Sequence, residues 1–126
     1  MTEQMRVNVS NTELGNVEIS EDVIEVIAGI CASEVEGVFA MQGNFTTGVA
    51  ERLGVKSHSK GVKVELTDEG ILLDLYVVLN NGASIPVVAA KLQESIRQTI
   101  KNMTALEVSE INVHIVGIRM EDDLIT

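Results

Sequence analysis

One arrangement occurs twice in this chain and limits what it can fold into. A short apolar run typical of a strand is followed by a long amphipathic helical pattern and then by a second strand-like run. The helical patterns span 21–35 and 86–103, and Ser20 and Ser84 precede them. Ser is a preferred residue at a helix N-terminus, and Gly37 is a common kind of helix terminator. The sequence therefore predicts a compact unit that mixes helices and strands.

The strand-like runs complete the order β-α-β-β-β-α-β. They span residues 16–19, 38–42, 62–66, 71–79 and 108–120. Turn residues from Thr67 to Gly70 predict a hairpin between the third and fourth runs. Two helices are too few to cover both faces of such a sheet. We therefore expect the α+β class, with a mixed sheet, both helices packed on one face and the other face open.

Three stretches lie outside this pattern. Residues 1–14 and the acidic residues 121–126 show no apolar period, and we expect loose tails around a single domain of residues 15–120. Residues 43–61 contain four glycines and little periodic structure. A stretch of this length inside a compact domain is usually mobile or functional.

The apolar positions predict which helix faces are buried. In the first helix the expected buried residues recur at helical spacing: Val23, Ile24, Ile27, Ile30, Cys31 and Val35. In the second helix they are Ala89, Leu92, Ile96, Ile100 and Met103. Both stripes should face the sheet.

Several features of the sequence predict a cytoplasmic protein that does not insert into a membrane. Cys31 is the only cysteine, so no intramolecular disulfide can form, which favours a reducing compartment. The polar residues 1–14 do not resemble a signal peptide. The longest apolar run, 71–79, is interrupted by Asp74 and is too short to span a bilayer.

The net charge of −10 argues against a nucleic-acid partner, because contacts with phosphates supply most of the affinity of such proteins. A KH-type RNA-binding loop, Gly-x-x-Gly with basic and apolar neighbours, is absent from the sequence. One segment reverses the sign of the charge and is a candidate contact for an anion or a partner: Arg52, Lys56, Lys60 and Lys63. A solvated loop is the alternative interpretation.

The titratable residues form no pattern typical of catalysis or metal binding. Cys31 lies on the apolar stripe of the first helix and is expected to be a core residue. His58 falls in the basic segment and His114 in an alternating strand, without the ligand spacing of a zinc site. The acidic residues lie on helix exteriors and turns rather than in pairs. We therefore expect no enzyme activity, no cofactor and no metal.

The stretch from Asn80 to Ser84 leads from a strand into a helix N-terminus. Backbone donors and the helix dipole can hold an anion at such a place. The stretch lacks the Lys of a phosphate-binding loop, and an ordinary turn also explains it. Together with residues 43–61, it supports an alternative function, a regulator that binds a small ligand or an anion.

Alternation along the last two strands predicts an apolar patch on the open face of the sheet. The expected apolar patch consists of Leu72, Tyr76, Val78, Val116, Ile118 and Met120. The candidate interaction face consists of Leu72, Tyr76, Val78, His114, Val116 and Ile118. Monomers seldom leave large apolar patches in water, and a two-fold pair of such faces would cover this one. The alternative is that residues 43–61 fold across it.

The glycines and apolar positions also occur in an ordered pattern. Its pieces are Gly15-x-Val17-x-Ile19-Ser20, Val23-Ile24-x-x-Ile27-Ala28, Glu34-Val35-x-Gly37-Val38, Lys60-Gly61-Val62-x-Val64, Asp74-Leu75-Tyr76-Val77-Val78, Ile85-x-x-Val88-Ala89 with Leu92-Gln93, and Val108-x-x-Ile111-Asn112-Val113-x-Ile115-x-Gly117-Ile118. This pattern resembles the alkaline shock protein family of Gram-positive bacteria, also called the envelope or general stress response family. The resemblance covers residues 15–118.

The resemblance implies a non-enzymatic stress-associated or housekeeping protein that acts through protein–protein contacts, with a possible homo-oligomer. It transfers no catalytic residue. Because the family includes soluble members encoded beside fatty-acid synthesis genes, it also allows a regulatory link to fatty-acid metabolism. The sequence departs from the family where a Thr-Gly-Leu turn is usual and Thr104-Ala105-Leu106 stands instead. Ala fits there only if the backbone does not need a positive φ.

Overall fold

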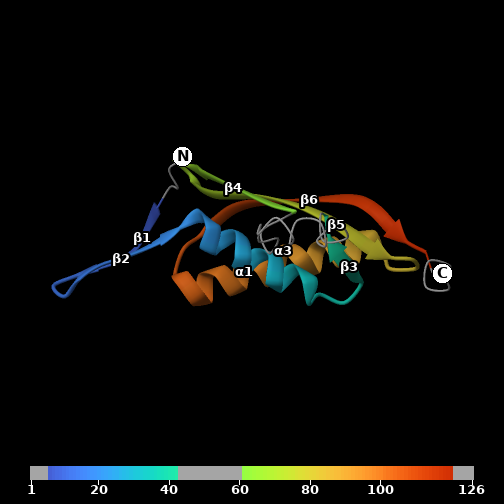
Figure 1. Cartoon of the computed structure of the whole chain (residues 1–126), viewed down its shortest axis with the longest axis horizontal. Helices are drawn as coiled ribbons and strands as arrows, with labels where there is room; N and C mark the ends of the chain where they lie inside the picture. The colour runs from blue at the N-terminus through green and yellow to red at the C-terminus, as the bar shows by residue number, and fades with distance from the viewer. Residues whose placement is uncertain (1–5, 43–60, 121–126) are drawn as a thin grey trace, which may run out of the picture.

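The computed structural model describes residues 6–42 and 61–120. A four-stranded mixed sheet is covered on one face by α1 (Glu21–Ser33) and α3 (Ile85–Thr104), as Figure 1 shows. The sheet strands are β3 (Val38–Met41), β4 (Val62–Thr67), β5 (Gly70–Asn80) and β6 (Val108–Arg119). The predicted α+β class, with both main helices on one face, is confirmed.

The long strand β5 is the centre of the sheet. It pairs in parallel with β6 along Ile71–Asn80 and antiparallel with β4 and β3. The predicted hairpin is present, because Thr67 lies opposite Gly70. Tyr76 accepts a hydrogen bond from Gln42 N–H and donates one to the carbonyl of Gly61, both at 2.8 Å. Since both groups of one residue point to the same edge of a strand, β3 and β4 share one edge of β5 and β6 occupies the other.

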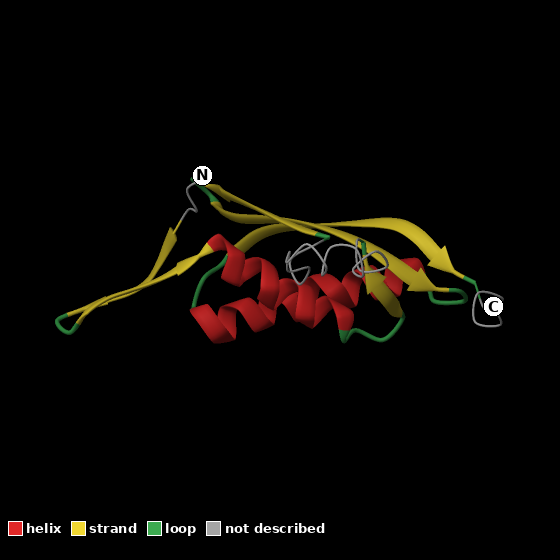
Figure 2. Ribbon diagram, in the orientation of Figure 1, coloured by secondary structure: helices red, strands yellow, loops and turns green. Residues whose placement is uncertain are grey.

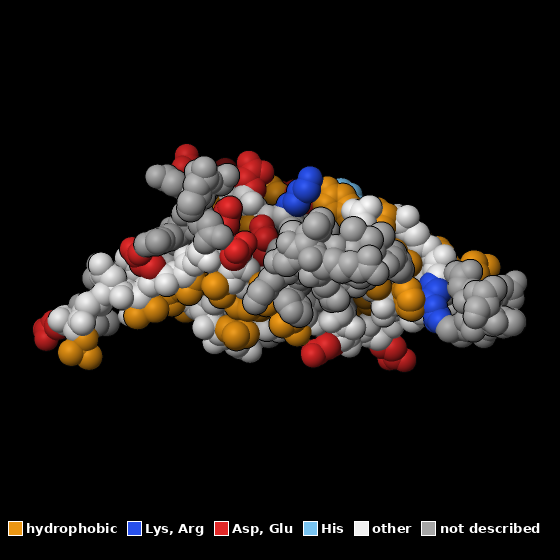
Figure 3. All heavy atoms as spheres, in the orientation of Figure 1, with side chains coloured by type: hydrophobic (Ala, Val, Ile, Leu, Met, Phe, Trp, Pro, Cys, Tyr) orange, Lys and Arg blue, Asp and Glu red, His pale blue; other side chains and the backbone are white. Residues whose placement is uncertain are grey.

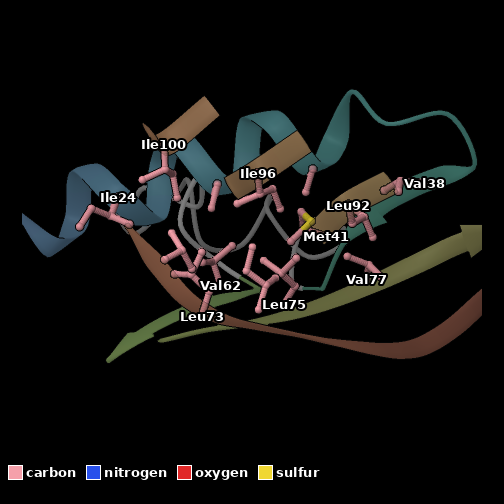
Figure 4. Packing of buried hydrophobic residues seen from close by; sticks show 14 of the residues in the cluster. Ile24, Val38, Met41, Val62, Leu73, Leu75, Val77, Leu92, Ile96 and Ile100 are labelled. Atoms are coloured by element: carbon pink, nitrogen blue, oxygen red, sulfur yellow. The ribbon is translucent and has the colours of Figure 1, made fainter. Parts of the chain in front are cut away.

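The core lies between the sheet and the two helices (Figure 4). The predicted inward residues of β5 are all buried: Ile71, Leu73, Leu75, Val77 and Leu79. From the helices they meet Ile24, Ala28, Ala32, Val88, Leu92, Ile96 and Ile100. Such an aliphatic core is stabilised chiefly by removal of apolar surface from water.

The outer side of α1 differs from the prediction. Val23 and Ile30 were expected in the core, but their side chains are 40% and 48% exposed. The buried residues are Ile24, Ala28, Gly29 and Ala32, and the first, second and fourth of these repeat every four residues along the buried side. Because α1 is apolar on most of its circumference, the sequence period could not identify the side that is buried.

The C-terminal end of α3 also differs from the prediction. Met103 was expected in the core, but it is 65% exposed. Thr104 is buried in its place, and its hydroxyl donates to the carbonyl of Ile100 and accepts from Leu106 N–H. Ala105 follows with φ 64°, so the backbone does adopt the left-handed conformation that Gly would favour.

The N-terminal segment is not simply a loose tail. Residues 6–12 form β1 (Arg6–Thr12), which pairs antiparallel with β2 (Gly15–Ser20). This hairpin extends from one end of the molecule as a two-stranded ribbon (Figures 1 and 2). The prediction of a loose 1–14 is therefore wrong for β1, whereas residues 1–5 and the predicted acidic tail 121–126 lie outside the described residues.

Candidate interaction face of the sheet

The candidate interaction face lies on the side of the sheet opposite α1 and α3. Side chains alternate between the two faces of a strand, so the even-numbered residues of β5 from Leu72 to Val78 point away from the helices. His114 of β6 lies directly opposite Tyr76 of β5 and shares this outer face. Lys63 of β4 lies opposite Asp74 and shares it as well.

An aromatic stack forms the centre of this face. The rings of Tyr76 and His114 are parallel within 13°, and their centroids lie 4.6 Å apart. The ammonium of Lys63 lies 5.7 Å from the Tyr76 centroid, on the side of β4, within the range of a cation–π contact. Three neighbouring strands thus bring one side chain each to the same place.

The His114 ring is also held by a carboxylate. Its Nε2 lies 3.1 Å from Oδ1 of Asp74, at which distance the ring N–H donates to the carboxylate. Both side chains are partly accessible to water. The stack with Tyr76 and the hydrogen bond to Asp74 together fix the orientation of His114 on the surface of the sheet.

A β-bulge changes the predicted membership of the face. Val77 lies opposite Ile115, but Val78 lies opposite Gly117, so Val116 is the additional residue. Ile118 therefore lies opposite Leu79, a core residue, and does not belong to the outer face as the alternation had predicted.

Arg119 takes part in the outer face instead. It lies opposite Asn80, and its guanidinium carbon is 4.5 Å from the centroid of the Phe39 ring, a cation–π contact across β5. Phe39 is the additional residue of a second bulge, between Val38 and Ala40. Sequence reasoning missed both residues, because a bulge has no clear signature in an alternating pattern.

The structure thus brings together some of the predicted residues. Tyr76 and His114 are in contact, and Val116 is 45% exposed nearby on β6. Leu72 is half-buried, whereas Val78 is only 6% exposed and offers little surface to a partner.

Two residues at this face differ from the prediction. Met120 was predicted to be a member of the apolar patch, but it follows the last residue of β6, where its side chain is exposed. Asp74, although predicted to point outward, was not predicted to be part of the site.

The predicted basic contact is described only in part. Lys63 is exposed on β4 and contacts the ring of Tyr76. Arg52, Lys56 and Lys60 lie outside the described residues, as does His58. The sign of the charge around Lys63 is mixed, because Asp74 lies opposite it in the sheet.

The turn that precedes α3 was the second candidate anion site. Its hydrogen bonds are those of an ordinary turn. Asn81 N–H donates to the carbonyl of Arg119, and Ala83 N–H donates to the carbonyl of Asn80. Gly82 has φ +94°, which explains the glycine. Two of the backbone donors that could have held an anion are therefore already used within the chain.

A shallow groove of about 200 Å³ lies between α3 and the first half of β6. Its lining residues are Ala90, Gln93, Glu94, Arg97, Val108, Ser109, Glu110 and Ile111. Gln93 Nε2 donates to the carbonyl of Ile111 at 3.0 Å, and Arg97 pairs with Glu94. The groove is smaller than most sites for small molecules, which enclose roughly 300–1,000 Å³.

Cys31 joins the two helices. It is half-buried, and its Sγ lies 3.5 Å from the hydroxyl of Thr99 on α3. Within the described residues, no group of three His, Cys, Asp or Glu side chains is placed to hold a metal ion. Nor does either described helix combine the length and apolarity needed to cross a membrane.

Comparisons with known proteins place this fold in a family. Residues 9–120 match the alkaline shock protein 23 family, described as having a cell envelope-related function. The uncharacterised protein YqhY of Bacillus subtilis is 58% identical over 117 residues, which cover 93% of this chain and 87% of YqhY.

Two further likenesses are more distant. A stress response regulator gls24 homolog of Streptococcus pyogenes is 28% identical, over 86% of this chain and 61% of its own length. A solved MamM CTD has a TM-score of 0.47 at 9% identity, covering 77% of this chain and 98% of that domain. The match over 9–120 confirms the resemblance found in the sequence, and the chain belongs to the alkaline shock protein 23 family.

Proposed function

We propose that this protein acts in the cytoplasm without catalysis, as a stress-associated protein that works through protein–protein contacts. The proposed contact surface is the outer face of the sheet around Tyr76, His114 and Val116. A second copy of the chain is the simplest partner for this face, because a two-fold axis would place each apolar patch on the other.

The stacked pair of Tyr76 and His114 is the observation that carries the proposal. These rings lie on a sheet surface rather than in a cleft, and Tyr is among the residues most often central to binding interfaces. A catalytic His needs a free nitrogen within reach of a substrate in a water-excluding site. His114 instead lies on the open surface of the sheet, where its side chain is 44% exposed to water.

The family adds support of a general kind. The description of the family refers to the cell envelope, and one group of relatives carries the name of stress response regulators. Regulation through contact is consistent with both descriptions.

Sedimentation at tens of micromolar tests the proposal. We expect the parent to sediment as a dimer, and we expect Tyr76→Asp and Val116→Asp to sediment as monomers, because each substitution places a charge in the apolar contact. Val116 is the more exposed of the two, so its variant should keep the fold even if Tyr76→Asp does not. Val87→Asp is the matched control, since Val87 is exposed on α3, away from this face.

A parent that is a monomer at this concentration would rule out self-association through the sheet. If Val87→Asp dissociates as readily as Val116→Asp, the contact between the two copies does not lie on the outer face of the sheet. Thermal unfolding of each variant separates loss of the contact from loss of the fold.

The alternative function, a regulator that binds a small ligand or an anion, has weaker support. The groove between α3 and β6 is small, and two of the polar groups that line it, Gln93 and Arg97, already bond within the chain. A screen of metabolites by thermal shift, including acyl compounds of fatty-acid metabolism, tests it, because any ligand of the folded state must raise the unfolding temperature.

A further inference from the structure

The strand β6 lies at an edge of the sheet, and one side of its backbone has no described strand beside it. Among the described strands, β6 pairs only with β5. The N–H and C=O of Tyr76 bond on the side of β3 and β4, so the neighbouring residues of β5 point theirs to β6. There they meet the backbone of His114, which lies opposite Tyr76. The backbone groups of Val113 and Ile115, on either side of His114, therefore point away from β5.

The same alternation extends to both ends of this edge. The carbonyl of Ile111, in the first half of β6, accepts a hydrogen bond from the side chain of Gln93 on α3. The carbonyl of Arg119 accepts one from Asn81 N–H on the side of β5, so the backbone groups of Ile118 point away from β5. Four residues thus present N–H and C=O groups at the edge: Ile111, Val113, Ile115 and Ile118.

The side chains of these four edge residues are apolar and lie on the face of the sheet that the helices cover. Ile118 is nevertheless 41% exposed, and Val113 and Ile115 are half-buried. β6 also contains no Lys or Pro, which often protect an edge strand from pairing with another chain. The residues of β5 opposite the four edge residues all belong to the core: Leu73, Leu75, Val77 and Leu79.

We propose that β6 pairs antiparallel with β6 of a second copy of this chain, so that two sheets join into one. An extended strand is the fitting partner, because it bonds to the backbone groups along a whole sheet edge. β6 can be its own partner, because the edge residues are placed symmetrically about His114. A two-fold axis at His114 brings Val113 opposite Ile115 of the second copy, with the backbone groups of both residues facing each other.

The groove between α3 and β6 receives a side chain in this arrangement. Because Val116 is the additional residue of a bulge, Ile111 comes to lie opposite Ile118 of the second copy. Ile111 lines the groove, so the side chain of Ile118 from the second copy reaches it and loses its exposure to water. Gln93 can keep its bond to Ile111, because a carbonyl oxygen has two lone pairs.

The distribution of charge favours the antiparallel orientation. It places Glu110 of one copy opposite Arg119 of the other at both ends of the joined strands, and opposite charges across strands are stabilising. Figure 3 shows that acidic side chains gather mainly toward the end of the molecule from which the N-terminal hairpin extends. The two-fold axis reverses the second copy along the strand, so these acidic ends lie apart. The net charge of −10 still opposes self-association, and we expect pairing to become stronger as salt is added.

This edge contact is separate from the contact surface proposed above, which lies on the outer face of the sheet. A single pair of strands buries less surface than a standard interface, so we expect a dissociation constant of about 0.5 mM. At tens of micromolar, Tyr76→Asp should therefore still sediment as a monomer. The two proposals can then hold or fail independently.

Amide exchange measured by NMR at two concentrations tests the edge contact. Tyr76→Asp is used first, because this substitution removes the contact on the outer face. Between about 0.05 and 1 mM, we expect exchange at the N–H groups of Val113 and Ile115 to slow about twofold. The N–H groups of Asn112 and His114 point to β5 and should not change. The parent gives the same measurement if Tyr76→Asp does not fold, since the outer face forms no bonds to these edge groups.

Three variants locate the contact. Ile118→Lys places a charge against the groove of the second copy and should abolish the dependence on concentration. Ile30→Lys adds the same charge at a residue of α1 that is 48% exposed, and it should keep that dependence. Val113→Pro removes one N–H of the edge and leaves the bonds to β5 in place, so it should also abolish it. Thermal unfolding of each variant shows whether the fold is kept.

Three results would overturn the proposal. They are exchange rates at Val113 and Ile115 that do not change with concentration, equal slowing at Asn112 and His114, and equal behaviour of Ile118→Lys and Ile30→Lys. Protection of Val113 and Ile115 at both concentrations would mean that another segment of the same chain covers the edge. A parent that is a monomer at tens of micromolar overturns only the contact on the outer face, because edge pairing requires a higher concentration.

Discussion

Gln42 and Gly61 are distant in sequence but pair with the same residue of the central strand. Gln42 N–H donates to the carbonyl of Tyr76, and Tyr76 N–H donates to the carbonyl of Gly61. In a continuous antiparallel strand, one residue opposite Tyr76 would make both bonds. On either side, Met41 lies opposite Val77, and Val62 lies opposite Leu75. In their pairing, β3 and β4 are therefore one strand that is interrupted after Gln42.

This relationship predicts that residues 43–61 can be removed without loss of the fold. In a variant that joins Gln42 directly to Val62, Gln42 would make both bonds to Tyr76 and the register on either side would be kept. We expect one cooperative unfolding transition, with a free energy of unfolding within about 2 kcal/mol of the parent, since long insertions have modest entropic costs. Urea denaturation followed by circular dichroism measures it.

A second deletion provides the control for the first. Joining Met41 to Val62 leaves no residue opposite Tyr76 and shifts the register by one residue, which would turn every side chain of β4 to the wrong face. This variant should be much less stable than the first. Equal stability of the two, or failure of the first to fold, would contradict the interpretation of β3 and β4 as one interrupted strand.

The ion pair at the end of α3 predicts a dependence of stability on pH. The hydrogen bond from Lys101, followed by its charge, lowers the pKa of Glu107 below its ordinary value of 4.5. A lowered folded-state pKa means that the pair stabilises the fold above the ordinary pKa and loses its effect as pH falls through the lowered value. The free energies of unfolding of the parent and Lys101→Gln should therefore differ at neutral pH and converge in acid.

The expected difference is small and sensitive to salt, because the pair is exposed. Lys91→Gln, on the exposed side of the same helix, is the control and should show no convergence of this kind. A difference between the parent and Lys101→Gln that persists below the lowered pKa of Glu107 would mean that Lys101 acts through packing rather than through this ion pair.

The sequence predicted the centre of the fold well. Alternation from Ile71 to Leu79 identified the inward residues of β5, because a strand buried on one face leaves little choice of register. The start of α3 was predicted from Ser84 and Pro86, and the hairpin from the turn at Gly70. These features depend on local chemistry, which a single sequence contains.

The errors concern features that depend on distant parts of the chain. Val23 and Ile30 were assigned to the core because α1 has apolar residues on both sides, and only the position of the sheet decides which side is buried. The strand β1 was missed because a two-stranded ribbon has little apolar signal of its own. At the candidate site, Tyr76 and His114 were correctly predicted to share a face, whereas the bulge at Val116 displaced Ile118.

The contact between Cys31 and Thr99 predicts a structural role for the cysteine. Cys31→Ala should lower the free energy of unfolding by about 1 kcal/mol, because a small, partly buried group is lost. Thr99→Val removes the same hydrogen bond from the other helix and is the matched comparison. Both variants should keep whatever function the parent protein performs in cells. Loss of that function in a well-folded Cys31→Ala, with rapid labelling of the parent by iodoacetamide, would instead indicate a functional thiol.

The turn after α3 predicts a stabilising substitution. Ala105 has φ 64° and ψ 12°, a left-handed conformation that is costly for a residue with a Cβ, and its N–H donates to the carbonyl of Lys101 as in a helix C-terminal motif. Ala105→Gly keeps this bond and removes the strain, so we expect the free energy of unfolding to rise by about 1 kcal/mol. Ala90→Gly, at an exposed position inside α3, should lower it by about the same amount, because Gly disfavours a regular helix. Urea denaturation of the two variants beside the parent measures both effects. If Ala105→Gly lowers stability as Ala90→Gly does, the left-handed backbone at residue 105 is not a source of strain.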